Sequence, residues 1–198
     1  MLSGRRLDLA DPSPLDVEID DIAHGLARVA RWNGQTIGAH PFSVAQHSLV
    51  VVDILQSLDA VSRRKAGRPA ALGLAALLHD APEYVIGDMI SPFKALLGDS
   101  YRQIEARLAS AIFVRHGLPA QLPDAWQKLI KRADRACALL EATQLAGFEP
   151  TEATKFFGKL PPALHDVTLE PMPPEEAAQA FLNRHRRLNA SFLAEGDD

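Results

Sequence analysis

The sequence has few of the features that mark secreted or membrane proteins. Among its 198 residues there is one cysteine, Cys137, so no internal disulfide can form and the chain fits a reducing compartment. The first residues carry no apolar segment of signal-peptide length. No apolar run reaches the about 20 residues that cross a bilayer. We therefore expect a cytoplasmic protein with no membrane partner.

Positive charge and strand patterns are also scarce. Lys and Arg number 21 against 25 Asp and Glu, a net charge of −4, so no nucleic-acid partner is expected. Only Val17–Ile19 shows the alternation of a strand. The expected fold class is all-α, a helical bundle with a short extended N-terminal arm. We expect one domain over 1–198, with a core at about 20–145 and a C-terminal strap and helix over 146–198.

Capping residues and apolar periodicity predict the main helices. Asp20 or Asp21 begins a helix that should end near Trp32. Ser43 and Gln46 form a capping box for the next helix, because a polar residue three positions after an N-cap serine can bond back to it. Further helices are expected over about 70–80, from 91, over 99–116, from 124 to about 140, and over 175–193.

The stretch 70–88 is the most informative part of the chain. Its first nine residues are almost purely apolar, so a helix there is buried on all sides and carries His79 and Asp80 inward. Burying such groups is costly unless they are paired or bind a metal. One interpretation is a His–Asp hydrogen bond that closes the helix end. His47 and Asp134, which also fall on or beside apolar helical stripes, favour a metal site.

These four residues form a mixed nitrogen and oxygen ligand set. Such a set suits one divalent transition metal (Mn, Co, Fe, Ni or Zn) better than Ca or Mg. His116 precedes a glycine at a helix end, where we interpret it as a capping residue.

The ordered set His47, His79, Asp80 and Asp134 resembles the signature of the HD-domain metal-dependent phosphohydrolases. The segments Ser43–Ser48, His79–Glu83 and Arg132–Asp134, with Glu141, further resemble the bacterial 5′-deoxynucleotidase branch over about residues 15–145. That branch often has Glu before the first histidine, where this chain has Gln46. Dinuclear HD enzymes add histidines between the His-Asp pair and the last aspartate. Since only His116 lies there, we expect one metal ion.

The resemblance also implies roles for individual residues. His47, His79, Asp80 and Asp134 would bind the metal. Glu83 would position or deprotonate the attacking water, and Asp88 would act near the phosphate and the leaving oxygen. Substrate contacts would come from Arg31 toward phosphate, Trp32 toward sugar or base, and Lys94 toward phosphate. If the family resemblance is set aside, two other interpretations are as good as the functional ones: Arg31 as a solvated residue at a helix end, and Trp32 as an anchor in the core.

The expected reaction is hydrolysis of a deoxynucleoside 5′-monophosphate, a small-molecule nucleotide, with release of phosphate. A deoxynucleoside triphosphate triphosphohydrolase is the alternative enzyme, and it would need more basic residues beside the phosphate tail. A non-catalytic HD protein that binds a nucleotide or metal, and a helical adaptor without metal, are the alternatives outside the enzyme class. A homodimer is an open alternative for the assembly.

Overall fold

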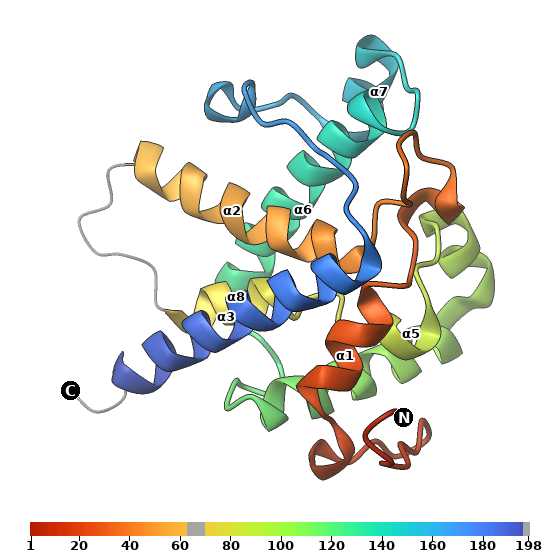
Figure 1. The fold of residues 1–198 in the computed structure, drawn as a ribbon, viewed down its shortest axis with the longest axis vertical. Coiled ribbons are helices and arrows are strands. Elements are labelled where there is room, and N and C mark those ends of the chain that lie inside the picture. The colour runs from red at the N-terminus through yellow and green to blue at the C-terminus, as the bar shows by residue number, and fades with distance from the viewer. Residues whose placement is uncertain (63–69, 196–198) are drawn as a thin grey trace.

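The computed structural model describes residues 1–62 and 70–195, and these form helices with irregular connections (Figure 1). The α-helices are α1 (Ile19–Leu26), α2 (Val44–Ser62), α3 (Ala70–Leu77), α4 (Glu83–Ile86), α5 (Ser91–Arg115), α6 (Asp124–Gln144), α7 (Pro150–Phe157) and α8 (Pro174–Glu195). Short 3-10 turns cover Pro14–Asp16, Arg31–Gly34 and Pro162–Leu164. Within the described ranges the only β-pairing is one isolated antiparallel bridge, Ala30 with Ser43. The all-α prediction is confirmed.

The core is built around α3, which packs against α2 and α8, while α2 also packs against α6. In Figure 1, α8 runs across the front of α2 and α3, with α6 behind them. The residues of α3 from Ala71 to Leu77 are buried except Gly73, because the helix is apolar on every side. At Gly73 the α3 backbone approaches α8 so closely that an added Cβ would lie 2.9 Å from Leu188. This packing fixes the residues that follow α3.

The predicted bounds of two helical regions differ from the structure. The first helix begins at Ile19 after the N-cap residue Glu18, so Asp20 and Asp21 lie in its first turn and do not cap it. It ends at Leu26, not near Trp32, and Trp32 and Asn33, with φ values of 56° and 52°, form a separate turn. The predicted helices from 91 and over 99–116 form α5, which is kinked at Gly98, where φ is 70° and ψ is −150°. The kink preserves the division that the sequence predicted.

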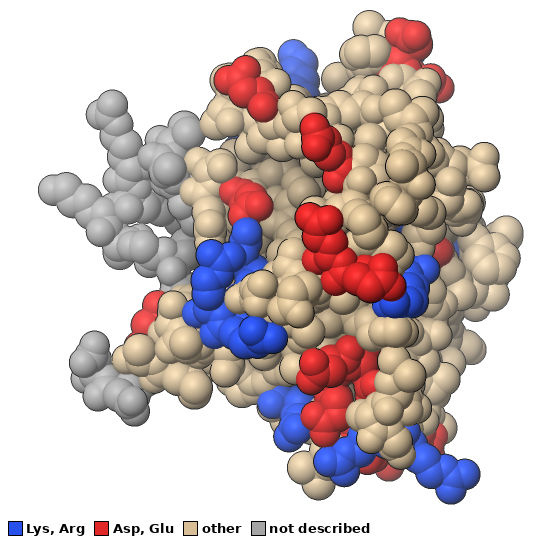
Figure 2. All heavy atoms as spheres, in the orientation of Figure 1, with Lys and Arg blue, Asp and Glu red and all other residues tan. Residues whose placement is uncertain are grey.

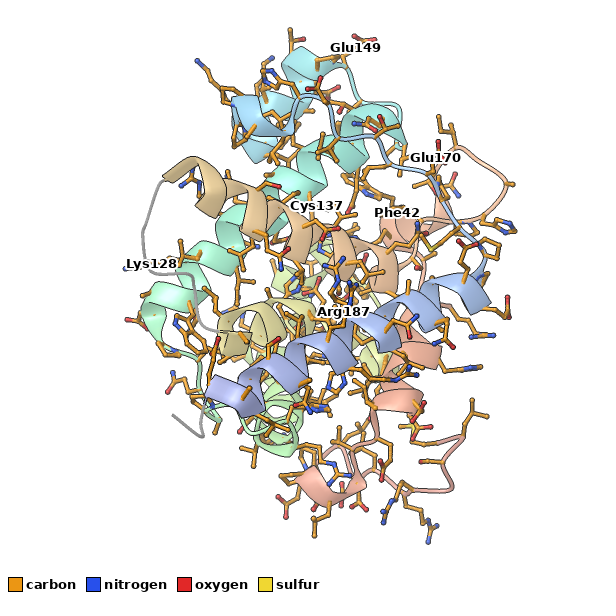
Figure 3. All side chains as sticks on the ribbon, turned by 60° about the vertical axis from the view of Figure 1, so that its left-hand side comes forward. Phe42, Lys128, Cys137, Glu149, Glu170 and Arg187 are labelled. Carbon is orange, nitrogen blue, oxygen red and sulfur yellow. The ribbon has the colours of Figure 1, made fainter. Side chains whose placement is uncertain are left out.

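A segment that includes Glu170 and Met172, which we call the strap, contacts Gln46 at the start of α2. The Gln46 backbone N–H donates to Ser43 Oγ at 3.2 Å, so the serine cap is confirmed. The return bond of the predicted capping box is absent, because the Gln46 amide faces the strap. It donates to the Glu170 carbonyl at 2.9 Å and accepts from the Met172 N–H at 3.0 Å. Glu170 is labelled on this strap in Figure 3.

The visible surface carries both signs of charge, with acidic and basic side chains interspersed on the face shown in Figure 2. In the part of the chain that the structure describes, no helix combines the length and the apolar character needed to cross a membrane.

Candidate metal centre and substrate pocket

The four predicted ligands come from three parts of the chain and meet in one place. His47 lies in the first turn of α2, His79 and Asp80 follow α3, and Asp134 lies in α6. His47 Nε2 is 3.4 Å from Asp80 Oδ2 and 3.5 Å from Asp134 Oδ1. His79 Nε2 is 3.1 Å from Asp80 Oδ2, and the two imidazole centroids are 5.4 Å apart. The fold therefore brings two imidazoles and two carboxylates together.

The donor atoms of this cluster fit a metal ion. The Nε2 atoms of His47 and His79 are buried and have no hydrogen-bond partner. Buried nitrogen atoms of this kind normally have a partner. His79 Nδ1 contacts the Ala76 carbonyl oxygen at 2.8 Å, which fixes the ring and turns Nε2 toward Asp80. Ligand atoms of His47, His79 and Asp80 all lie within 4.8 Å of one another, close enough to share one ion.

A second group, His47 with Cys137 and Glu141, also has metal-ligand spacing. Figure 3 places Cys137 among the helices near the centre of the molecule. Burial and the Glu141 carboxylate raise the pKa of the Cys137 thiol to about 12, so it remains protonated. Its Sγ donates to Glu141 Oε1 at 3.2 Å. Because a thiol must lose its proton to bind a metal, the Nε2 side of His47 is the better site.

The carboxylates of the cluster are held in the ionised form. Burial alone would raise the pKa of Asp80, but His79 and His47 outweigh it and hold that pKa well below its usual range. The pKa of Asp134 is likewise lowered against burial, through its contact with His47. Lys131 Nζ donates to the Asp134 Oδ2 at 2.8 Å. The cluster therefore offers two ionised carboxylates beside the histidine Nε2 atoms, and carboxylate oxygens attract a cation.

Glu83 begins α4 close to this cluster and is 3% exposed. Lys94 Nζ donates to Glu83 Oε1 at 3.3 Å and to Glu105 Oε1 at 3.0 Å. The other oxygen, Glu83 Oε2, is buried without a partner. Burial, followed by the charges of Asp80 and Asp88, raises the Glu83 pKa to about 8. Lys94 thus contacts the predicted acid, where the sequence predicted a phosphate contact.

Arg31 joins two carboxylates from distant parts of the chain. Its Nη1 donates to Asp88 Oδ2 at 3.0 Å, while Nε and Nη2 both lie 3.2 Å from Glu141 Oε2. The neighbouring Trp32 Nε1 donates to the same Glu141 oxygen at 2.8 Å. Arg31 and Trp32, two of the predicted substrate residues, thus share Glu141 with His47, and Arg31 is paired with acids.

Two cavities open on these residues. One of about 510 Å³ lies between the Arg31–Trp32 turn, the start of α5 and α7, and its aromatic lining is Trp32, Phe148, Phe156 and Phe157. A second, of about 340 Å³, is lined by His79, Asp80 and Asp134 together with Gln121, Gln127 and Lys131. An apolar cavity beside a polar cluster is the usual form of a small-molecule site.

A third cavity, about 710 Å³, lies beside the second and shares Gln127 and Lys131 with it. Its remaining cations are Lys128, Arg132, Arg135 and Lys159. We call it the basic groove. Lys128, labelled in Figure 3, lies at the edge of the molecule.

Comparison with known proteins identifies the family of this chain. Residues 21–156 match the family model described as 5′-deoxynucleotidase YfbR-like, which covers more than half of the chain. The chain belongs to the YfbR-like 5′-deoxynucleotidase family. The resemblance stated from the sequence, and the prediction of a hydrolase of this branch, are confirmed.

Relatives of this YfbR-like chain differ in their sequence identity to it. An uncharacterised protein of Rhodobacter capsulatus is 52% identical over 97% of this chain and 95% of its own. The uncharacterised protein YfdR of Escherichia coli is 30% identical over 74% of this chain and 75% of its own. The 5′-deoxynucleotidase YfbR of Salmonella typhi is 32% identical, over 52% of this chain and 60% of its own.

Sequence reasoning gave no role to one residue at the centre of this YfbR-like site. Glu141 contacts His47, Arg31 and Trp32 and is 0% exposed. The signal was present, because Glu141 lies seven residues after Asp134 and therefore on the same face of α6. His116 is the C-cap residue of α5, as predicted, and its ring packs on His185 with centroids 4.8 Å apart.

Proposed function

We propose that this protein is a metal-dependent phosphohydrolase that releases phosphate from a deoxynucleoside 5′-monophosphate. The observation that supports it best is the pair of buried Nε2 atoms, on His47 and His79, which have no hydrogen-bond partner beside two ionised carboxylates. We infer that His47, His79, Asp80 and Asp134 hold one divalent transition metal. Such an ion would polarise the phosphate and lower the pKa of an attacking water.

We infer that Glu83 takes the proton of this water. Its pKa is about 8 in the metal-free protein, and a cation held by the neighbouring cluster would lower that pKa so that the carboxylate can act as a base. Its Oε2 is free to accept a hydrogen bond, while Oε1 is held by Lys94. Asp80 follows α3 and Glu83 begins α4, and the Glu83 N–H donates to the Asp80 carbonyl at 3.0 Å. The Asp80 charge contributes to the raised pKa of Glu83, so the two carboxylates are close enough to interact. An acid within reach of the water can act as base or acid.

The aromatic cavity suits the nucleoside part of the substrate. Trp32 packs against Phe148 and Phe157 with centroid distances of 5.5 and 6.0 Å and interplanar angles of 59° and 74°, and these rings give an aromatic wall for a sugar or base. Arg31 and Asp88 line the same cavity, and Arg31 also contacts Glu141, the partner of His47. We propose that Arg31 contacts the phosphate and that Asp88 acts beside the leaving oxygen, held by its ion pair with Arg31.

The basic groove favours a second candidate, a deoxynucleoside triphosphate triphosphohydrolase. It adjoins the cavity of the metal cluster through Gln127 and Lys131, so a longer phosphate chain could extend into it. Lys128, Arg132 and Arg135 would supply the positive charge that such a tail needs. The reaction product separates the two candidates, because only the triphosphohydrolase releases tripolyphosphate.

The test is a substrate panel with Mn²⁺ or Co²⁺ added to purified protein. We expect phosphate release from deoxynucleoside monophosphates, with ribonucleoside monophosphates and deoxynucleoside triphosphates in the same panel. Asp80→Ala should abolish turnover and leave the helical circular-dichroism signal largely intact. Tripolyphosphate as the product would favour the second candidate. Full turnover by Asp80→Ala, or none by the wild-type protein on any nucleotide, would refute the proposed mechanism.

A further inference from the structure

The Glu141 carboxylate is fully buried, and both of its oxygens accept hydrogen bonds. One oxygen contacts the predicted metal ligand His47, and the other contacts the predicted substrate residues Trp32 and Arg31. Oε1 lies 2.5 Å from His47 Nδ1 and accepts from the Cys137 thiol. Oε2 accepts from Trp32 Nε1 at 2.8 Å and from the Arg31 guanidinium. A charge buried this deeply is tolerated only when it is fully paired, as it is here.

The contact with His47 determines which ring nitrogen faces the metal cluster. An ionised carboxylate only accepts hydrogen bonds, so Nδ1 carries the proton that it donates to Glu141. Nε2, the atom directed at Asp80 and Asp134, is then the ring nitrogen that is left to bind a metal once it has lost its own proton. Carboxylates behind metal-binding histidines fix the ring and raise its basicity in this way.

The contact with Trp32 stabilises a strained turn. Trp32 and Asn33 are the only non-glycine residues with positive φ in the described ranges, and each such residue costs roughly 1–2 kcal/mol. The indole N–H bond to Glu141 and the Arg31 ion pair hold this turn against α6. The same turn presents Arg31 and Trp32 to the aromatic cavity.

We propose that Glu141 is a positioning residue that links metal binding to substrate recognition, an inference that rests on the proposed function. Through His47 it orients a metal ligand, and through Trp32 and Arg31 it orients the turn that lines the nucleoside cavity. Removing it should therefore weaken the affinity for the metal and raise KM for the nucleotide together. A residue with a merely structural role would affect neither in the folded protein.

The first experiment measures Mn²⁺ affinity by calorimetry on metal-free wild type, Glu141→Gln and Trp32→Phe. Glutamine offers one oxygen, so it cannot accept on both sides. We expect Glu141→Gln to weaken Mn²⁺ binding about 10- to 100-fold. Trp32→Phe removes only the indole donor, so it should change the Mn²⁺ affinity less than threefold while it raises KM. Glu141→Gln within threefold of wild type for Mn²⁺ would overturn the inference.

Glu141→Gln leaves the buried Arg31 with Asp88 as its remaining charged partner, and this loss can prevent folding. A second comparison covers that outcome. Arg31→Met and Arg31→Met/Glu141→Gln both lack this charge. We expect the double variant to bind Mn²⁺ about 10- to 100-fold more weakly than Arg31→Met. Equal affinities would overturn the inference while the proposed function stands. A wild-type protein that binds no Mn²⁺ would instead refute the proposed function.

Discussion

Replacing Glu83 by glutamine should stabilise the metal-free protein while it abolishes phosphate release. The Glu83 pKa is raised to about 8 from an ordinary value of 4.5, by burial and then by Asp80 and Asp88. The folded protein therefore binds this proton more tightly than the unfolded chain does. It follows that the free energy of unfolding falls as the pH rises from about 4.5 to about 8.

The size of the effect follows from the two pKa values. At pH 7 the carboxyl of the unfolded chain is about 2.5 units above its pKa, whereas the folded carboxyl is still below its own. At about 1.36 kcal/mol per unit, keeping Glu83 protonated in the fold costs at most about 3 kcal/mol of unfolding free energy. We expect about half of this, roughly 1.5 kcal/mol, since neighbouring groups relax around the charge. For a chain of this length that is about 3–6 °C in Tm. Glutamine has the same shape and can still accept from Lys94.

The assay is thermal unfolding in chelator at pH 7 and pH 5, with Mn²⁺-supported phosphate release measured on the same preparations. The gain in Tm for Glu83→Gln should shrink at pH 5, because the unfolded carboxyl is then only about half a unit above its pKa, compared with about 2.5 units at pH 7. Glu105→Gln is the matched control, because it removes the other partner of Lys94 from a more exposed position. A Glu83→Gln protein no more stable than wild type at pH 7, or one with normal turnover, would refute the reasoning.

Two other changes test the packing and the second histidine pair. Gly25→Ala should destabilise the fold by about 1–3 kcal/mol and lower turnover. The added Cβ would lie 2.8 Å from Tyr84 Cβ, in the helix that carries the predicted base Glu83. Urea unfolding measures the change in stability. The His116 pKa is lowered to about 4 by burial, then by His185 and Arg115, so stability should fall as the pH drops from about 6.5 toward 4. In His116→Phe, Tm should depend less on pH over that range.

Each of these changes has a matched comparison. Gly73→Ala places its Cβ 2.9 Å from the flexible end of Leu188, which can rotate away, so it should cost less than Gly25→Ala. Equal costs would argue against the close contact at Tyr84. For the histidine pair, exposed His165 is the control, and His165→Phe should leave the pH dependence of Tm unchanged. A His116→Phe protein with the wild-type pH dependence would contradict the assignment.

The cluster could be predicted from the sequence because the burial of each member follows from the residues next to it in the chain. An apolar run that ends in His79 and Asp80 can only be buried, and helical spacing placed His47 and Asp134 inward as well. The Arg31–Trp32 turn could not be foreseen in the same way. Its positive φ values depend on the bond from Trp32 to Glu141, which lies 109 residues further along the chain. Propensity alone extends the first helix through these residues.

The roles of Gln46 and Lys94 were also decided by distant contacts. A serine followed by glutamine three residues later is typical of a capping box, but the Gln46 amide instead binds the strap near Glu170. Lys94 was expected to face a phosphate, yet Glu83 and Glu105 are its partners in the structure. In both cases the residue lies where it was expected, and tertiary contacts determine what it binds.

The most direct test of the central claim is an anomalous-difference map from crystals of the protein soaked in Mn²⁺. We predict one strong peak per chain, within bonding distance of His47 Nε2, His79 Nε2, Asp80 and Asp134. A peak between Cys137 and Glu141, or no peak at saturating Mn²⁺, would contradict the account.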